Sequence, residues 1–280
     1  MLRLDLINQP VSGNKYYKLK YNIEEAKSQH RDTLLTFGGA YSNHILATAQ
    51  AGRLLGMKTL GVIRGEELAE KWQDNPTIRA AADSGMTFHF VSREDYRMKG
   101  NEEFITNLRQ KFGDFYLVPE GGTNDLAVRG TAEILGEDEA GFNYICCSVG
   151  TGGTLAGIAN SATPEQQILG FPALKGDFLK EDICNFTDRK NWELSGDYHF
   201  GGYARVNKEL VEFINEFKAT TGIPLDPVYT GKMIFGILDL VKNGSFNPGT
   251  SILAVHSGGL QGINGMNKKL KEKNLPLIEL

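Results

Sequence analysis

Short apolar runs that end in glycine and lead into helical patterns recur along this chain, and this repeat limits its fold more than any other feature. Residues 33–37 (TLLTF) are followed by Gly38 and Gly39 and then by apolar side chains at helical spacing. Residues 143–149 (NYICCSV) lead in the same way into a glycine-rich turn and another helical pattern. Parallel strands need a long crossover connection, usually a helix, so this alternation predicts parallel sheets. We therefore predict an α/β fold.

The alternation extends over both halves of the chain. Further strands are expected at residues 59–63, 87–91, 115–119, 167–171 and 251–256, and helices at 19–29, 75–84, 102–112, 126–135, 175–187 and 208–220. Pro76 is typical of a first helical turn, where the missing N–H is not needed. A second strand and helix series begins at Glu120 without any low-complexity linker. We place the boundary between two lobes near Thr123.

The composition argues against several classes of function. The 280 residues carry a net charge of −4 and no run of like charges, so we expect no nucleic-acid partner. Residues 1–10 lack the apolar core of a signal peptide, and no apolar run approaches the roughly 18 residues of a membrane span. We expect a cytoplasmic protein with no membrane partner. Glycine is unusually frequent: 33 of the 280 residues are glycine, which is about 12%, whereas average proteins contain about 7%.

The cysteines do not suggest a metal site. Cys146 and Cys147 lie in an apolar run that reads as a buried strand, and Cys184 stands alone. The chain contains neither a C-x-x-C pair nor an HExxH motif. We predict core thiols and no bound metal.

The segment GNKYYKL, residues 13–19, places two lysines three positions apart. Gly13 and Asn14 favour a turn, so we expect Lys15 in a loop that enters a helix and Lys18 one turn later on the helix face. Both amines could then point into one cavity, where they could bind a phosphate or form an imine. The alternative for the segment taken alone is a pair of solvated lysines.

Four glycine turns follow predicted strands or precede predicted helices, at positions where backbone N–H groups can bind an anion. They are GGAYSN (38–43), SVGTGGT (148–154), VYTGK (228–232) and HSGG (256–259). SVGTGGT is the strongest phosphate candidate, although it is neither a nucleotide P-loop nor a GxGxxG motif. Each turn has a structural alternative, such as helix capping by Ser42 or Ser257. Together with a lysine, the four supply the groups that pyridoxal phosphate requires.

With these segments the chain resembles the fold type II (tryptophan-synthase-β-like) pyridoxal-phosphate enzymes, and among them the branch of 1-aminocyclopropane-1-carboxylate (ACC) deaminase and D-cysteine desulfhydrase. The matching segments are GNKYYKLKYN, GGAYSNH, PEGGTN, SVGTGGTLAG, VYTGK and HSGG, in family order. The resemblance implies two open, twisted, parallel-sheet lobes with the cofactor cleft between them. It implies a larger lobe of residues 1–20 and 124–280, a smaller lobe of residues 21–123, and a homodimer.

The resemblance also implies roles for individual residues. Lys15 resembles the lysine that carries pyridoxal 5'-phosphate as a Schiff base, and Lys18 resembles a phosphate contact. Asn43 resembles the side chain that binds the cofactor's ring hydroxyl. Ser42 and Tyr229 match residues that position or protonate the substrate. The phosphate loop corresponds to Gly150, Thr151, Gly152, Gly153 and Thr154.

Two further cofactor-contact positions bear on the reaction. ACC deaminases have glutamate and leucine where this chain has Thr230 and Ser257, whereas D-cysteine desulfhydrases have threonine at both positions. A glutamate near the pyridine nitrogen keeps it protonated and strengthens the electron sink, whereas a neutral hydroxyl does not. The resemblance therefore favours a lyase of amino-acid metabolism that performs α,β-elimination on a small D-amino acid. D-Cysteine is the favoured substrate, giving pyruvate, ammonia and hydrogen sulfide.

Three alternatives stay open at this point. They are an ACC deaminase, a dehydratase or racemase of serine, and a non-catalytic protein that uses SVGTGGT to bind a phosphate ligand. The chain departs from the family pattern at Ser257, and only 14 residues precede Lys15. We expect part of the family's usual covering or dimer contact to be missing from the larger lobe.

Overall fold

The computed structural model describes residues 1–176 and 178–279. The chain divides into two compact units, one of Met1–Lys18 together with the chain from Asn124 onward, and one of Leu19–Thr123. The boundary between Lys18 and Leu19 falls inside helix α1 (Asn14–Ser28). We propose that these units are the two lobes expected from the sequence.

The sheet of the larger unit joins the two ends of the chain. Its strand order is β1-β9-β6-β7-β8, and every pairing in it is parallel. Leu2 pairs with Val255 and Arg3 with His256, so the residues before Lys15 are anchored to the last strand. The strands are β1 (Leu2–Arg3), β6 (Tyr144–Val149), β7 (Gln167–Pro172), β8 (Trp192–Leu194) and β9 (Ile252–His256).

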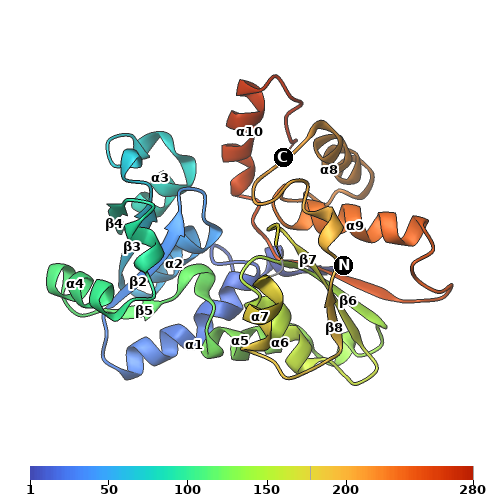
Figure 1. Ribbon diagram of the computed structural model, residues 1–280, viewed down its shortest axis with the longest axis horizontal. Coiled ribbons are helices and arrows are strands. Elements are labelled where there is room, and N and C mark those ends of the chain that lie inside the picture. The colour runs from blue at the N-terminus through green and yellow to red at the C-terminus, as the bar shows by residue number, and fades with distance from the viewer. Residues whose placement is uncertain (177, 280) are drawn as a thin grey trace. The chain divides into compact units, whose positions relative to one another are not determined.

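Both faces of this sheet are covered by helices (Figure 1). Alternate residues of β6 point to opposite faces, as strand geometry requires, so Cys147 and Cys146 belong to different core clusters. The cluster with Cys147 includes side chains of α5 (Asp125–Thr131), α6 (Gly153–Ser161) and α7 (Phe178–Cys184). The cluster with Cys146 includes side chains of α8 (Lys208–Thr221), α9 (Thr230–Lys242) and α10 (Gly262–Glu272).

The smaller unit is built in the same way around a sheet of order β4-β3-β2-β5, again wholly parallel. Leu60 and Val62 of β3 pack with Leu108 of α4 (Glu102–Phe112), whereas Ile63 packs with α2 (Asn43–Leu55) and α3 (Pro76–Asp83). The strands are β2 (Thr33–Gly39), β3 (Lys58–Arg64), β4 (Met86–Val91) and β5 (Tyr116–Val118).

The predicted α/β class with parallel sheets is confirmed, and some predicted elements are corrected. The first helix begins at Asn14 and not near residue 19, so Lys15 is helical and not in a loop. The short strand β8 was not predicted. The helix predicted at 175–187 includes residue 177, which lies outside the described residues; α7 is shorter than predicted.

Candidate functional site

The turn at Gly13 holds Lys15 against the turn that follows β9. Gly13 has a φ of +71°, its N–H donates to the Leu4 carbonyl over 2.8 Å, and the Asn14 N–H donates to the Ser257 carbonyl over 3.2 Å. A Cβ atom at position 13 would collide with that Ser257 carbonyl oxygen. Glycine is therefore required both by the left-handed backbone and by the close approach.

The amines of Lys15 and Lys18 share an environment that disfavours positive charge. Burial lowers the pKa of Lys15 to about 8, an effect that the carboxylate of Asp226 partly opposes. Burial also holds the pKa of Lys18 well below its usual value, and the charge of Lys15 lowers it further. A lysine that is partly neutral near physiological pH is a competent nucleophile and base. Two neighbouring amines of this kind also suit an anionic ligand.

The start of α6 supplies further donors beside Lys18. Lys18 Nζ donates to Thr151 Oγ1 over 3.3 Å, and Asn14 Nδ2 donates to Thr154 Oγ1 over 2.8 Å. Helix α6 begins after Gly152, whose φ is +81°, and has no side-chain cap. Backbone N–H groups at such a helix start favour negative charge. The structure thus brings Lys18 together with Gly150, Thr151, Gly152, Gly153 and Thr154, and this donor set fits a phosphate group.

Tyr229 lies against the same glycine turn. Its ring is 3.2 Å from the place that a Cβ atom of Gly150 would occupy, so glycine at position 150 leaves room for the tyrosine. The Tyr229 N–H donates to Asp226 Oδ2 over 3.0 Å, which fixes the backbone of the tyrosine at the beginning of α9. Tyr229 is therefore placed beside the turn that fits the phosphate.

Tyr203 is a candidate site residue that the sequence did not predict. Its ring packs edge-on against Tyr229, with the ring centroids 6.2 Å apart. Two glycines, Gly201 and Gly202, precede it. This pattern of glycines beside a hydroxyl-bearing side chain also occurs in the four turns that were singled out, and it was the signal that could have identified Tyr203.

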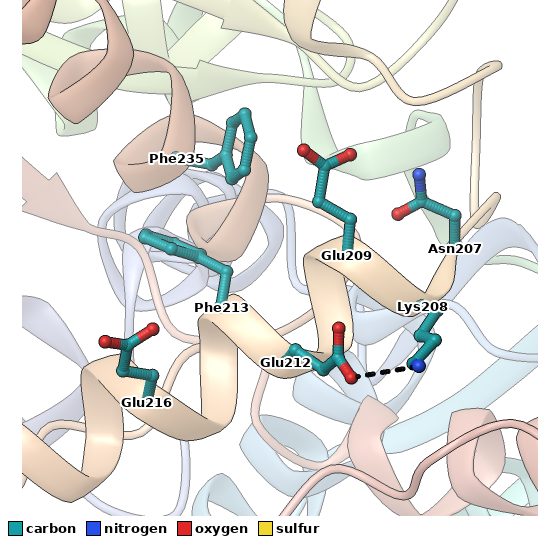
Figure 2. Close-up of a pocket in the computed structure, with 7 residues that line it drawn as sticks. All are labelled: Asn207, Lys208, Glu209, Glu212, Phe213, Glu216 and Phe235. Atoms are coloured by element: carbon teal, nitrogen blue, oxygen red, sulfur yellow. Dashed lines mark ion pairs between the residues drawn. The ribbon is translucent and has the colours of Figure 1, made fainter.

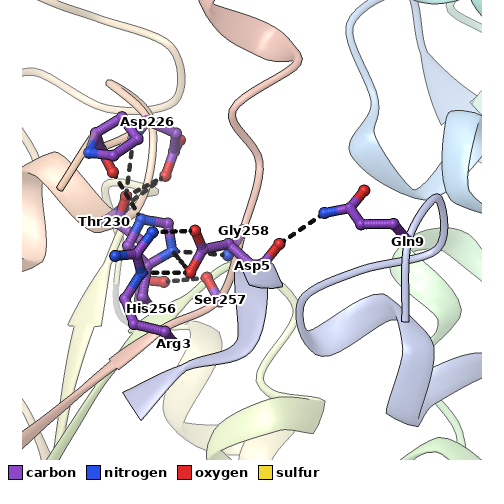
Figure 3. Close-up of polar contacts among 10 residues, drawn as sticks. Arg3, Asp5, Gln9, Asp226, Thr230, His256, Ser257 and Gly258 are labelled. Atoms are coloured by element: carbon purple, nitrogen blue, oxygen red, sulfur yellow. Dashed lines mark hydrogen bonds and ion pairs between the residues drawn. The ribbon is translucent and has the colours of Figure 1, made fainter. Parts of the chain in front are cut away.

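Thr230 is bonded to Asp226, another residue that the sequence did not single out (Figure 3). The Thr230 side chain is fully buried; its hydroxyl donates to Asp226 Oδ1 over 2.7 Å and accepts from the Asp226 N–H over 2.9 Å. Asp226 also accepts from the N–H groups of Val228 and Thr230 over 2.9 and 2.7 Å. The hydroxyl of Thr230 therefore fixes the carboxylate that accepts from the first N–H of α9. The signal for Asp226 was an acidic residue just before the helix start.

Ser257 lies at the carboxyl end of β9, and its Oγ is 3.2 Å from Ser148 Oγ. The preceding residue, His256, is completely buried; its Nε2 lies 2.8 Å from the Pro224 carbonyl oxygen and its Nδ1 lies 3.3 Å from Asp5 Oδ1 (Figure 3). Two hydrogen bonds from Arg3 hold the same carboxylate. Ser257 therefore follows a strand end whose position is fixed by the hydrogen bonds of His256 and by the contact of His256 with Asp5.

Ser42 and Asn43 belong to the smaller unit. Ser42 Oγ accepts a hydrogen bond from the Ile45 N–H over 3.3 Å and caps α2, of which Asn43 is the first residue. Both residues lie just beyond the carboxyl end of β2, where parallel α/β sheets bind ligands.

A cavity of about 580 Å³ lies along α8 and contains none of the predicted site residues (Figure 2). Its walls carry the aromatic rings of Phe213 and Phe235 and several charged side chains, among which Lys208 and Glu212 form an ion pair of 3.4 Å. The pairing neutralises part of the charge of this cavity.

The thiols of Cys146 and Cys147 are buried in the core. Burial holds the pKa of Cys147 at about 12 and raises that of Cys146 even more. In the part of the chain that the structure describes, no group of three or more His, Cys, Asp or Glu side chains could hold a metal ion. Within residues 1–176 and 178–279, no helix is long and apolar enough to cross a membrane.

A family model described as pyridoxal-phosphate dependent enzyme matches residues 1–258. A mitochondrial protein of Arabidopsis thaliana, named as a bifunctional D-cysteine desulfhydrase and ACC deaminase, is 31% identical over 93% of this chain and 72% of its own length. A protein of Pyrococcus abyssi, provisionally assigned as an ACC deaminase, is 30% identical over 96% of this chain and 87% of its own length.

The chain is also similar to solved structures. The crystal structure of an ACC deaminase homologue has a TM-score of 0.84 and 28% identity, and the match covers 96% of this chain and 87% of that chain. An O-acetylserine-dependent cystathionine β-synthase from Helicobacter pylori has a TM-score of 0.65 at 14% identity, with 93% of this chain and 87% of that chain covered. The second likeness concerns the fold alone.

Proposed function

Because the chain belongs to the pyridoxal-phosphate dependent enzymes, in the branch of ACC deaminases and D-cysteine desulfhydrases, we propose that it is a lyase that eliminates the β substituent of a small D-amino acid. The favoured substrate is D-cysteine, and the products are pyruvate, ammonia and hydrogen sulfide. We also propose a homodimer, to be tested by light scattering of the holoenzyme.

The proposed cofactor contacts follow from the donors described above. Lys15 holds pyridoxal 5'-phosphate covalently, Lys18 and residues 150–154 bind its phosphate, and Asn43 binds its ring hydroxyl. The single observation that carries this proposal is a pair of neighbouring lysines with lowered amine pKa values, of which Lys18 bonds to Thr151 at the uncapped start of α6. The bound cofactor supplies an electron sink for negative charge at the substrate α-carbon.

The remaining chemistry is proton handling by the chain's own groups. Once the substrate amine has displaced Lys15 from its covalent bond, the freed amine of Lys15, whose pKa of about 8 suits a base at neutral pH, accepts the proton from the α-carbon. The bond from the β-carbon to sulfur then breaks, and the thiolate leaves with the bonding electron pair. Tyr229 and Ser42 position or protonate the substrate. Hydrolysis of the remaining three-carbon unit gives pyruvate and ammonia.

The choice of elimination over ring opening rests on neutral hydroxyls near the proposed ring. Ser257 takes the place at which we expect a partner for the pyridine nitrogen, and its Oγ has a second hydroxyl, that of Ser148, at 3.2 Å. Thr230 stands where ACC deaminases have glutamate, and its hydroxyl is bonded to Asp226. A neutral partner gives a weaker electron sink, which is sufficient when the leaving group is a thiol.

ACC deamination is the second candidate, because the relatives from Arabidopsis thaliana and Pyrococcus abyssi bear that name. Both reactions release ammonia, but only D-cysteine releases sulfide. The holoenzyme is therefore incubated with D-cysteine, and sulfide, ammonia and pyruvate are measured together. Equal amounts of all three support the proposal, and their absence from a Lys15→Ala variant supports the role of Lys15. Cofactor binding without turnover of either substrate would favour the non-catalytic alternative.

A further inference from the structure

Lys232, the lysine of VYTGK, is a buried cation for which the proposed function has no use. Its side chain is 2% exposed, and its Nζ donates to two backbone carbonyls, that of His199 over 2.8 Å and that of Gly202 over 2.9 Å. Burial lowers the pKa of Lys232 to about 8, and the charge of Asp226 partly opposes this effect. Burying an amine costs free energy unless its N–H donors are satisfied, and these two hydrogen bonds offset part of that cost.

The two carbonyls belong to one strained loop. The loop contains four residues with positive φ, namely Phe200 at 51°, Gly201 at 88°, Gly202 at 112° and Ala204 at 52°. Side chains with a Cβ atom rarely adopt this conformation, so Phe200 and Ala204 carry backbone strain. Strain of this kind persists only where surrounding contacts determine the backbone.

Lys232 bonds to both turns of this loop. The His199 carbonyl also accepts from the Gly202 N–H over 3.0 Å, and the Gly202 carbonyl also accepts from the Arg205 N–H over 3.1 Å. One amine therefore joins the acceptor of the first turn to the acceptor of the second. A separate apolar contact, between the rings of Phe200 and Phe235 at 5.0 Å, attaches the loop to α9 independently of the lysine.

Tyr203 directly follows Gly202, the residue that the two turns share, and is the second residue of the second turn. Its side chain is 44% exposed, and its ring contacts that of Tyr229 with a centroid distance of 6.2 Å and an interplanar angle of 67°. Tyr229 immediately precedes α9, three residues before Lys232, and lies against Gly150. The lysine thus connects the loop that carries one tyrosine to the helix that begins beside the other.

We propose that Lys232 is a positioning residue that holds Tyr203 against Tyr229. Lys232 touches neither cofactor nor substrate; its two bonds fix the backbone of residues 199–202, which leads directly into Tyr203. The catalytic consequence rests on the proposed function, in which Tyr229 contacts the substrate, whereas the positioning itself does not depend on it.

The first test measures the loop directly, without any activity. Arg205 is exposed at the end of the loop, so trypsin cleavage after Arg205 reports how often the loop opens. Lys232→Met preserves the length of the side chain and removes its donors. We expect cleavage after Arg205, followed by mass spectrometry, to become at least about 10-fold faster, because two hydrogen bonds to the loop are lost. The control Lys242→Met, at the exposed end of the same helix, should cleave at the wild-type rate. Equal rates for Lys232→Met and wild type would overturn the proposal.

The second test asks whether Lys232 acts through Tyr203. Lys232→Met should lower kcat/KM for D-cysteine by at least about 10-fold in the wild-type background and by less than about 2-fold in a Tyr203→Ala background. Lys232→Arg keeps donors and should recover part of the loss. An equal loss in both backgrounds would refute the coupling. If Lys232→Met does not fold, Lys232→Leu, which also lacks donors, replaces it in both tests with the same expectations. If the wild type does not act on D-cysteine, the proposed function fails, and the cleavage rates still decide the positioning role.

Discussion

At the scale of single residues, Asp226 links the groups on which the account depends. Its carboxylate accepts from the hydroxyl of Thr230 and from the N–H of Tyr229. Its charge also raises the pKa values of Lys15 and Lys232 against the effect of burial. One buried acid therefore fixes the beginning of α9 and helps to retain protons on both amines.

The lowered pKa of Lys15 predicts a specific pH dependence of cofactor capture. Only the neutral amine attacks an aldehyde, so below pH 8 the rate should rise by about 10-fold for each pH unit and then level off near pH 8. An unperturbed lysine would give rates that rise up to about pH 10.4. Absorbance after mixing apoprotein with pyridoxal phosphate measures the rate, with Lys15→Arg as the control without covalent capture. A continued rise through pH 10 would contradict the assigned pKa.

Thr230 is predicted to matter for stability through its bonds to Asp226. Thr230→Val keeps the shape of the side chain but leaves the buried carboxylate and the Asp226 N–H with one partner fewer, which should lower the free energy of unfolding by about 1–3 kcal/mol. Thr230→Ser keeps the hydroxyl and should lose less. Urea denaturation of both variants measures the difference. Equal stability of the valine and serine variants would show that these hydrogen bonds contribute little.

Sequence patterns singled out residues that stand next to glycines at strand ends. They did not reveal residues whose neighbours in the fold are distant in the sequence. Lys15, Ser257 and the SVGTGGT turn carry local signals, because a close backbone approach requires glycine. Asp226 has the signal of a helix cap, yet its proximity to Lys15 depends on how segments about 200 residues apart fold together. The contact of Tyr203 with Tyr229 likewise requires tertiary structure.

At the scale of elements, the start of α1 decides where Lys15 lies. The sequence suggested a loop at residues 13–15 followed by a helix, but the reversal is completed at Gly13 alone and the helix begins at Asn14. The bonds from Gly13 to Leu4 and from Asn14 to Ser257 make this possible, and they come from residues distant in sequence. The three-residue strand β8 was missed because a polar stretch precedes it and Glu193 stands at its centre, so it lacks the apolar run that revealed the equally short β5.

Gly13→Ala should therefore be more harmful than an ordinary substitution of a left-handed glycine. Gly56 is a matched control, because its φ is +66° and a Cβ atom there would meet nothing within 4 Å. Gly56→Ala should cost about 1 kcal/mol from backbone strain alone. Gly13→Ala adds the collision with Ser257 and should cost at least about 1–3 kcal/mol more. Thermal unfolding of the two apoproteins compares them; equal losses would argue against the close approach at Gly13.

At the scale of the whole molecule, each unit has its own parallel sheet with a core on both faces. This architecture was predictable, because strand and helix patterns alternate throughout the sequence and parallel pairing requires such crossovers. The glycine turns at the strand ends, together with a lysine, predicted pyridoxal phosphate as the cofactor. The choice of substrate depends on a few side chains around the proposed ring.

The substrate preference of this protein is decided by comparing kcat/KM for D-cysteine and for ACC with one preparation of holoenzyme. The account predicts at least about 100-fold preference for D-cysteine, or ~2.7 kcal/mol in transition-state free energy, with one sulfide released for each pyruvate. ACC turnover as efficient as that of D-cysteine, or pyruvate formation without sulfide, would contradict it.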